Sequence, residues 1–340
     1  MKNKKLAFKA ALSVFLFLFG AFNSFAQISI LFVDDTDDSF QNAETFYDAI
    51  EATEYTADYF DALAEGSGPN LSEMEVYDLV IWHTSTDGVG LHLWDGQDQD
   101  NEDLKAYLET GGNLWLVGLD FLFDRYDAPP STFSEGDFVY DFLGLMSYDN
   151  QSYGDDGQIG VPLVTPLPDA PIAGLQDVTW SLETLWWVDG ITPAPGISAI
   201  YKMDGEDYPL SGQTCAVLNQ GDEFTALTYL FDLAIATPAD LSGNTLSILE
   251  YFENLVLSTS ELENNAASLI YPNPVRTYFR IRTAPSEKVE FVSILNTNGR
   301  VVARYEGGYD KYPAYDLGPG VYTVKIFTES GEIRNRLIKL

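Results

Sequence analysis

The run Ile28-Ser29-Ile30-Leu31-Phe32-Val33-Asp34-Asp35 decides the fold of the larger part of this chain. A nearly continuous apolar run that ends in acidic residues is typical of a strand buried on both faces of a sheet. Further strands are predicted at residues 56–60, 77–83, 113–118 and 224–231, and helices at 40–50, 102–108 and 245–257. This order predicts an α/β domain with a mostly parallel sheet and helices on both faces.

Three segments of this domain carry a family resemblance. Residues 30–35, residues 77–82 and the run from Leu104 to Leu114, which contains Gly111-Gly112, are similar to the class I glutamine amidotransferase-like fold. This is a flavodoxin-like sheet, and the closer likeness is to the noncatalytic version found in secreted proteins of the immune inhibitor A type. The resemblance covers residues 28–125 and 222–257. Between them, residues 124–215 are rich in Gly, Pro, Tyr and Trp and predict irregular insertions or edge strands.

The catalytic residues of the resembled family do not recur in its order. Active members need a cysteine on a sharp turn after a strand, with a late histidine and glutamate. The turn corresponds to residues 117–121, where Asp120 stands in place of cysteine. Cys215 is the single cysteine and lies in an apolar run, which favours a structural thiol. The two histidines, His83 and His92, both precede the turn. The resemblance therefore implies a silent scaffold.

Charge is divided unequally along the chain. Residues 28–260 hold 3 basic and 43 acidic residues, a net charge of −40, whereas residues 261–340 hold 11 basic and 9 acidic ones. So acidic a domain repels nucleic acid and anionic membranes, and it attracts cations. Solubility or salt tolerance is the alternative explanation of the same charge.

Acidic clusters make calcium the one candidate cofactor. The first cluster follows the first strand, where open α/β sheets place their ligands, and the second alternates acidic residues in a loop, as calcium sites do. Solvated charge is the alternative interpretation. The candidate ligands are Asp34, Asp35, Asp37, Asp38, Asp95, Asp98, Asp100 and Glu102.

The calcium hypothesis has a direct test. Five acidic residues within positions 95–103 repel one another unless a cation binds between them, so a specific site should stabilise the folded domain. Chelation is expected to lower the temperature of thermal unfolding or to increase protease sensitivity. If chelation changes neither, the hypothesis fails.

Aromatic residues suggest a ligand site in the irregular part of the domain. Trp186 and Trp187 are adjacent and stand near Glu183 and Asp189. Flat aromatic faces next to carboxylates are typical of carbohydrate-binding sites, so this pair is the candidate for contact with a glycan. Packing in the core is the alternative role of tryptophan.

The last part of the chain predicts a small all-β sandwich. Short runs rich in β-branched and aromatic residues occupy 289–295, 301–305, 321–327 and 333–338, and glycines separate them. The segment resembles the type A C-terminal sorting domain of the type IX secretion system, found in Bacteroidetes-type bacteria. The residues that carry the resemblance are Tyr271, Pro272, Asn273, Pro274, Gly299, Arg300, Gly320, Tyr322 and Lys339.

The N-terminus carries a matching export signal. Four lysines in the first nine residues precede an apolar run, and Ser24-Phe25-Ala26 offers small residues before a cleavage site. We therefore expect a signal peptide at 1–26, the acidic domain at 27–258, a linker at 259–268 and the sandwich at 269–340. No transmembrane span is expected after cleavage, and the protein should be secreted or attached to the outer surface of the outer membrane.

The sequence leaves three functions open. The first is a binding module for a glycan or protein ligand on a silent amidotransferase-like scaffold. The second is a hydrolase of glycans or peptides that uses an acidic site at the strand ends, with Asp120, Asp34 and His83 as candidate catalytic residues. The third is a structural or adhesive surface protein. Turnover that is lost in Asp120→Asn would favour the second function, and ligand binding without turnover would favour the first.

Deletion of residues 269–340 tests the sorting function. The truncated protein is expected to accumulate in the periplasm, because the resembled domain carries the signal for passage across the outer membrane. Immunoblots of periplasm and medium check this, and release of the truncated protein into the medium would contradict it.

Overall fold

The computed structural model describes residues 28–36, 41–85, 90–96, 99–221, 224–265, 268–271, 273, 275–283, 288–296, 300–309, 311–328 and 331–340. The expected signal peptide at 1–26 lies outside the described residues. Among the helices in the described part, none is both long enough and apolar enough to cross a membrane.

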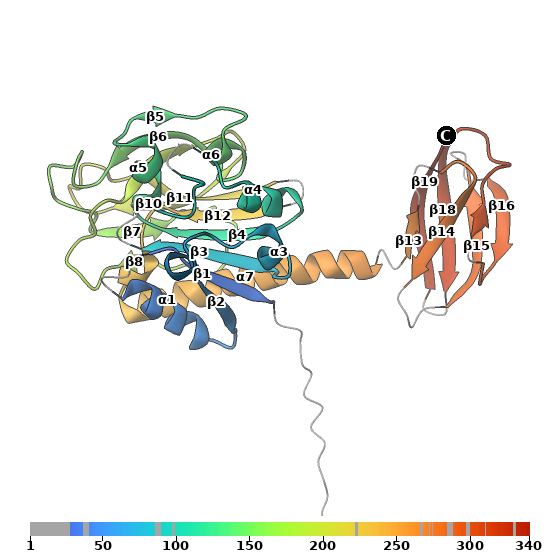
Figure 1. The fold of residues 1–340 in the computed structure, drawn as a ribbon, viewed down its shortest axis with the longest axis horizontal. Helices are drawn as coiled ribbons and strands as arrows, with labels where there is room; N and C mark the ends of the chain where they lie inside the picture. Colours follow the sequence, from blue (N-terminus) through green and yellow to red (C-terminus); the bar gives the residue numbers. More distant parts are fainter. Residues whose placement is uncertain are drawn as a thin grey trace, which may run out of the picture.

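Five parallel strands form one half of the large sheet (Figure 1). All residues of the first and last strands in sequence are buried, as their continuous apolar runs predict. The carboxyl ends of all five parallel strands meet at one edge of the sheet, so the residues that follow these strands are brought together. In spatial order the strands are β2 (Ala57–Asp61), β1 (Ile30–Asp34), β3 (Leu79–Ser85), β4 (Asn113–Gly118) and β12 (Thr225–Tyr229).

Antiparallel strands form the other half of the sheet, so the sheet is mixed rather than mostly parallel. Residues 124–215 supply most of them, because short Thr- and Val-containing segments joined by turns can pair antiparallel without crossover helices. The sheet continues from β12 through β11 (Thr214–Gln220), β10 (Ser198–Asp204), β7 (Leu163–Pro166) and β8 (Val178–Thr179), while β9 (Asp189–Pro193) joins β11 to β6 (Leu145–Gln151) and β5 (Ser131–Thr132).

Helices cover both faces of the sheet, as predicted. Apolar residues of α1 (Asn42–Glu51) and α7 (Pro238–Asn265) pack on one face, next to the short helix η1 (Leu233–Ile235). The other face packs against α2 (Ala62–Glu65), α3 (Leu71–Met74), α4 (Glu102–Glu109), α5 (Phe121–Tyr126) and α6 (Phe138–Asp141).

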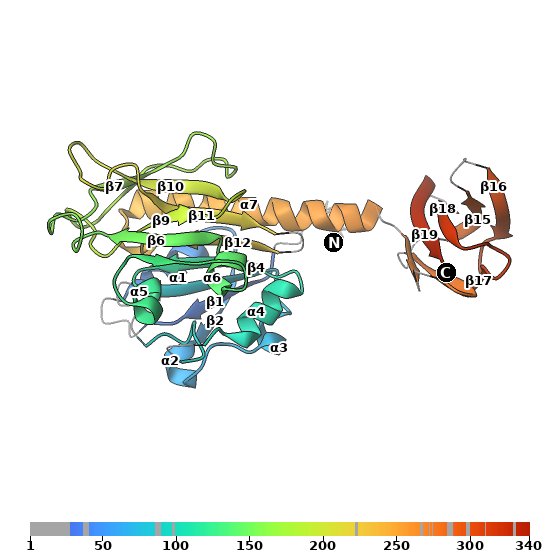
Figure 2. The same ribbon diagram turned by 90° about the horizontal axis from the view of Figure 1, so that it is seen from above.

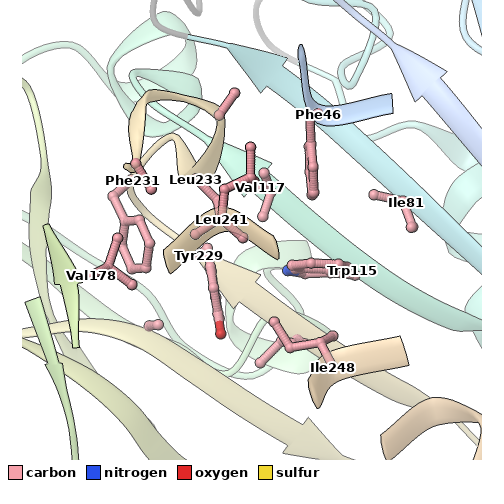
Figure 3. Close-up of a cluster of buried hydrophobic side chains, with 14 of the residues drawn as sticks. Phe46, Ile81, Trp115, Val117, Val178, Tyr229, Phe231, Leu233, Leu241 and Ile248 are labelled. Atoms are coloured by element: carbon pink, nitrogen blue, oxygen red, sulfur yellow. The ribbon is translucent and has the colours of Figure 1, made fainter. Parts of the chain in front are cut away.

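The alternation of side chains along each strand divides the core into two clusters. On the face covered by α1 and α7, Trp115 packs edge-on against Phe46 at 5.2 Å and against Tyr229 at 5.8 Å between ring centroids (Figure 3). Cys215 is fully buried in the same cluster, and burial raises the pKa of its thiol well above the usual value. This agrees with the structural role predicted for the thiol.

Helix α7 is longer than the sequence predicts. It runs to Asn265, through most of the stretch expected to be a linker, and both ribbon views show it extending beyond the sheet (Figures 1 and 2). No glycine or proline occurs from Asn244 to Asn265 to end the helix.

The C-terminal part forms the predicted β-sandwich. One sheet holds β13 (Ser268–Tyr271), β14 (Tyr278–Thr283) and β17 (Tyr312–Pro313), and the other holds β16 (Val301–Glu306), β15 (Val289–Leu295), β18 (Gly320–Thr328) and β19 (Gly331–Lys339). Residues of both sheets share one apolar core.

The side chains of Asn273 and Tyr322, two residues of the sorting motif, form hydrogen bonds within the domain. Asn273 accepts a hydrogen bond from the backbone N–H of Ile338 at 2.8 Å, and Tyr322 donates its hydroxyl to the carbonyl of Gly318 at 2.8 Å. The motif residues Pro272, Pro274 and Gly299 lie outside the described residues. The hydrogen bond between Asn273 and Ile338 holds the start of the domain to its last strand, β19.

Candidate functional site

The three candidate catalytic residues lie at the carboxyl edge of the parallel strands. Strand β1 ends at Asp34, β3 contains His83 near its end, and Asp120 follows β4. Asp34 and His83 are register partners on neighbouring strands. The topology therefore supplies the edge at which ligands bind in open α/β sheets.

Asp120 occupies a sharp strand-to-helix turn, as the resemblance implied. It stands at φ 61° and ψ 0°, in the left-handed region, between β4 and α5. A non-glycine residue in that region costs about 1 kcal/mol or more, and such strain is concentrated at functional sites. The Oδ1 atom of Asp120 accepts a hydrogen bond from Gln151 Nε2 at 2.8 Å.

Gln151 connects Asp120 to a second, deeper carboxylate. The same Nε2 atom donates to Asp189 Oδ1 at 3.0 Å, because Gln151 and Asp189 are cross-strand partners on β6 and β9. Asp189 is fully buried, and burial first and the charge of Asp120 second raise its pKa well above the usual value. Sequence reasoning missed Gln151 because the pairing of β6 with β9 was not predicted.

His83 forms a buried pair rather than an accessible base. Its Nε2 atom lies 3.0 Å from Asp232 Oδ1, and both side chains are fully buried. Asn42 donates Nδ2 to the other carboxylate oxygen at 2.9 Å, and the Phe46 ring lies 5.3 Å from the imidazole. Asp232 was not predicted, although it directly follows the strand expected at 224–231, which is the signal that could have found it.

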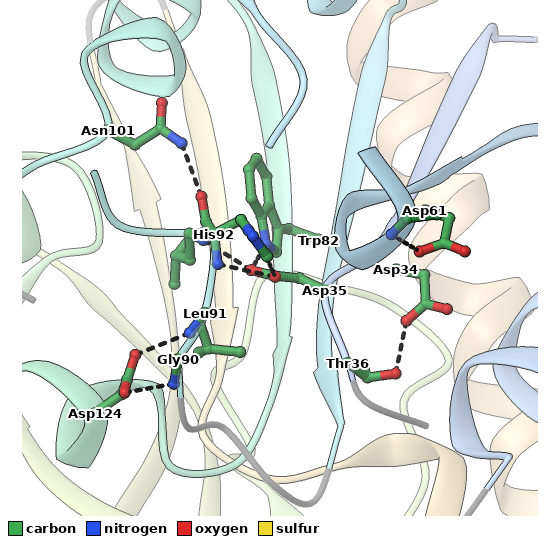
Figure 4. A network of polar contacts seen from close by, with 12 residues as sticks. Asp34, Asp35, Thr36, Asp61, Trp82, Gly90, Leu91, His92, Asn101 and Asp124 are labelled. Atoms are coloured by element: carbon green, nitrogen blue, oxygen red, sulfur yellow. Dashed lines mark hydrogen bonds and ion pairs between the residues drawn. The ribbon is translucent and has the colours of Figure 1, made fainter. Parts of the chain in front are cut away.

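Asp35 binds nitrogen donors with both of its oxygens. Oδ1 accepts from the backbone N–H of His92 at 2.9 Å and lies 3.0 Å from His92 Nδ1, while Oδ2 accepts from Trp82 Nε1 at 3.0 Å and from the Leu93 N–H at 2.7 Å (Figure 4). Asp35 is 3% exposed. This carboxylate holds residues 92–93 against the end of β1.

Its neighbour Asp34 is also engaged by protein donors. Thr36 donates its hydroxyl to Oδ1 at 2.7 Å, and the hydroxyl of Tyr59 donates to Oδ2. The contacts of Asp120 instead include Gln151. The two aspartates that the hydrolase hypothesis paired thus have different partners.

The second acidic cluster lies at the start of α4. Asp95 accepts from the backbone N–H of Glu102 at 3.3 Å, and Asp100 forms an ion pair with Arg125 at 2.6 Å. Within the described ranges, no three His, Cys, Asp or Glu residues form a group that could hold a metal ion. Asp37, Asp38 and Asp98 lie outside the described residues, so calcium stays a prediction.

A pocket of about 420 Å³ lies next to the Asp120 turn, and it contains the predicted tryptophan pair. We call it the tryptophan pocket. Trp186 is 47% exposed, which contradicts a core role for this residue. Its lining includes Leu119, Leu182, Glu183, Trp186, Trp187 and Ile235.

A local aromatic cluster fixes the tryptophans. Tyr153 packs between them, with ring centroids 4.8 Å from Trp186 and 4.8 Å from Trp187. Tyr153 and Trp187 both have positive φ, at 71° and 68°. Gly160 lies beneath Trp186, where an added Cβ would stand 2.4 Å from the indole. The pocket wall is therefore built by strained backbone and close packing.

Residues 269–340 match the family described as the secretion system C-terminal sorting domain. The match supports a secreted protein that is exported by the type IX secretion system and interacts with its machinery. No curated protein matches the chain.

Solved structures similar to this chain are diverse. A cytoplasmic protein from Salmonella typhimurium LT2 aligns over 68% of this chain and 99% of its own, at 11% identity and a TM-score of 0.41. A beta-galactosidase from Halorubrum lacusprofundi aligns over 92% and 40%, at 12% identity and 0.42. PorZ, a surface component of the type-IX secretion system of Porphyromonas gingivalis, aligns over 24% and 12%, at 23% identity and 0.19. These scores carry no argument about function.

Asp189→Asn is expected to stabilise the α/β domain at neutral pH. The pKa of Asp189 is higher in the folded state than in the unfolded state. The free energy of unfolding therefore falls as pH rises from the unfolded-state pKa near 4 toward the folded-state pKa. The amide removes that loss and still accepts from Gln151. Thermal unfolding should show a midpoint about 2–4 °C higher, which corresponds to roughly 1 kcal/mol.

The matched control is Asp156→Asn. Asp156 is buried and accepts from the N–H groups of Ile159 and Gly160, and these contacts outweigh burial, so its pKa is lowered. The ionised Asp156 carboxylate stabilises the folded state above its unfolded-state pKa, and this stabilisation is lost as pH falls through its folded-state pKa. This variant should unfold at a lower temperature. Equal destabilisation by both variants would contradict the assignment of Asp189 as a destabilising buried acid.

Proposed function

We propose that the acidic α/β domain is a secreted, catalytically silent amidotransferase-like module that binds a glycan in the tryptophan pocket. The observation that carries the proposal is the exposure of Trp186 in this pocket of about 420 Å³. Ligand pockets combine apolar and aromatic walls with a few polar groups, and an exposed indole face suits the apolar face of a sugar ring. The module would act after export, released or attached to the outer surface of the outer membrane.

The residues at the edge support a silent scaffold. Asp120 stands where the resembled family has its cysteine, and Cys215 is buried with a raised pKa, whereas a nucleophilic cysteine needs an accessible thiolate. His83 is fully buried against Asp232. A histidine held in this way reaches a ligand only if the fold opens.

Trp186→Ala is expected to weaken glycan binding strongly. The indole is 47% exposed in the pocket lining, and losing one stacked aromatic should weaken binding at least about tenfold. Quenching of tryptophan fluorescence and calorimetry with a panel of neutral and charged oligosaccharides measure the affinity of the purified chain.

The matched control for Trp186→Ala is Phe123→Ala. Phe123 is 38% exposed on α5, and it is not part of the pocket wall. This variant should bind glycans as the unchanged chain does. If both variants bind equally well, or if no oligosaccharide binds the unchanged chain, the proposed function is wrong.

A hydrolase remains the second candidate, because of Asp120 and Asp189. Their oxygens accept from one nitrogen at 2.8 and 3.0 Å, which brings the two carboxylates close together, and the pKa of Asp189 is raised. Retaining glycosidases use two close carboxylates of unequal pKa. The same oligosaccharides are therefore analysed for cleavage products. Cleavage that is lost in Asp120→Asn would favour this function over simple binding.

A further inference from the structure

We infer that the sugar bound by the tryptophan pocket is an amino sugar with a free, positively charged amine, an inference that rests on the proposed function. Three properties of the molecule carry it: the charge of the pocket wall, the charge of the domain around it, and the aromatic surface that the pocket presents.

The pocket wall is negative and holds no basic residue. Glu183 is exposed in the lining, next to the apolar side chains of Leu182 and Trp186. Leu119, another lining residue, directly precedes Asp120, whose carboxylate shares Gln151 with Asp189. A cation in the pocket would therefore be attracted both by the Glu183 carboxylate in the wall and by the Asp120 carboxylate behind it.

The rest of the domain does not compensate this charge. The whole domain has 3 basic residues and a net charge of −40. Arg125 is paired with Asp100, and Lys202 is 3.0 Å from Asp204. Lys105 lies on α4, which packs on the face of the sheet opposite the cluster that contains Leu119 and Ile235. The long-range field therefore concentrates cations and repels uronic acids and sulfated sugars.

The aromatic wall suits the same ligand. Trp186, with its ring braced by Tyr153 at 4.8 Å, offers an indole face that attracts a cation through the ring quadrupole and stacks on the apolar face of a sugar. A neutral sugar would use only the stacking. A simple metal cation would use only the charge. An amino sugar uses both, so it is the occupant that the combination selects.

The experiment compares two oligosaccharides that differ only in the acetylation of their amines. The purified chain is titrated with a tetramer of glucosamine and a tetramer of N-acetylglucosamine, at low and at high sodium chloride. The glucosamine tetramer should bind about tenfold more tightly at low salt, and raising the salt should reduce this preference.

Two variants and one further probe separate specific from diffuse attraction. Trp186→Ala should weaken the binding of both sugars, whereas Glu183→Gln should lose much of the preference for the charged tetramer over the neutral one. Tetralysine, which carries at least as much positive charge and no sugar ring, should bind weakly and without dependence on Trp186.

Each outcome supports or overturns a defined statement. Equal or tighter binding of the N-acetylated tetramer overturns the preference for an amine and leaves glycan binding intact. Binding of neither tetramer, nor of any other oligosaccharide, overturns the proposed function itself. Equal binding of tetralysine that survives in Trp186→Ala overturns the inference, because the attraction would then be diffuse.

Discussion

The arrangement of the carboxyl edge depends on one carboxylate, that of Asp35, which is engaged by four nitrogen atoms at the end of β1. These contacts hold residues 92–93 in place. Asn101 continues the connection, because it donates to the carbonyl of His92 at 3.2 Å and accepts from the N–H of Leu104 at the start of α4. A buried donor left without such an acceptor costs about 1–3 kcal/mol. The side chains of Asp35 and Asn101 thus join a strand, a loop and a helix.

Carboxylates accept hydrogen bonds from neutral donors elsewhere in the domain as well, because acidic residues far outnumber basic ones. Asp124 accepts from the N–H groups of Gly90 and Leu91, and Asp240 accepts from the N–H and hydroxyl of Thr179. Hydrogen bonds from neutral donors to ionised carboxylates are stronger than those between neutral groups, so the carboxylates can stabilise the fold although basic partners are scarce. Asp35 and Asp95, two of the candidate calcium ligands, accept hydrogen bonds from backbone N–H groups in the same way. The tryptophan pocket, by contrast, has aromatic surface that the fold leaves exposed.

Sequence reasoning recovered what local pattern determines. The strands around Phe32, Trp82 and Trp115 were predicted because continuous apolar runs have few alternatives. The C-terminal sandwich followed from its short β-rich runs as well as from its resemblance, and the turn at Asp120 was expected from the second resemblance. The partners of these residues were not predictable. The contacts of Gln151 with Asp189 and of His83 with Asp232 join positions 38 and 149 residues apart, and they depend on strand pairing that no local signal encodes. Exposure of Trp186 likewise depends on the packing of Tyr153 and Gly160 around it.

A crystal structure of the full chain with bound glucosamine tetramer is the most direct test of how roles are divided between the tryptophan pocket and the strand ends. We predict that the tryptophan pocket binds the ligand and that the carboxylates at the strand ends stabilise the fold. We expect one sugar ring to stack on Trp186, its amine to lie within hydrogen-bond distance of the Glu183 carboxylate, and Asp35 to keep its nitrogen partners. A tetramer bound to the carboxylates of Asp34 or Asp35, with their present donors displaced, would contradict this division of roles.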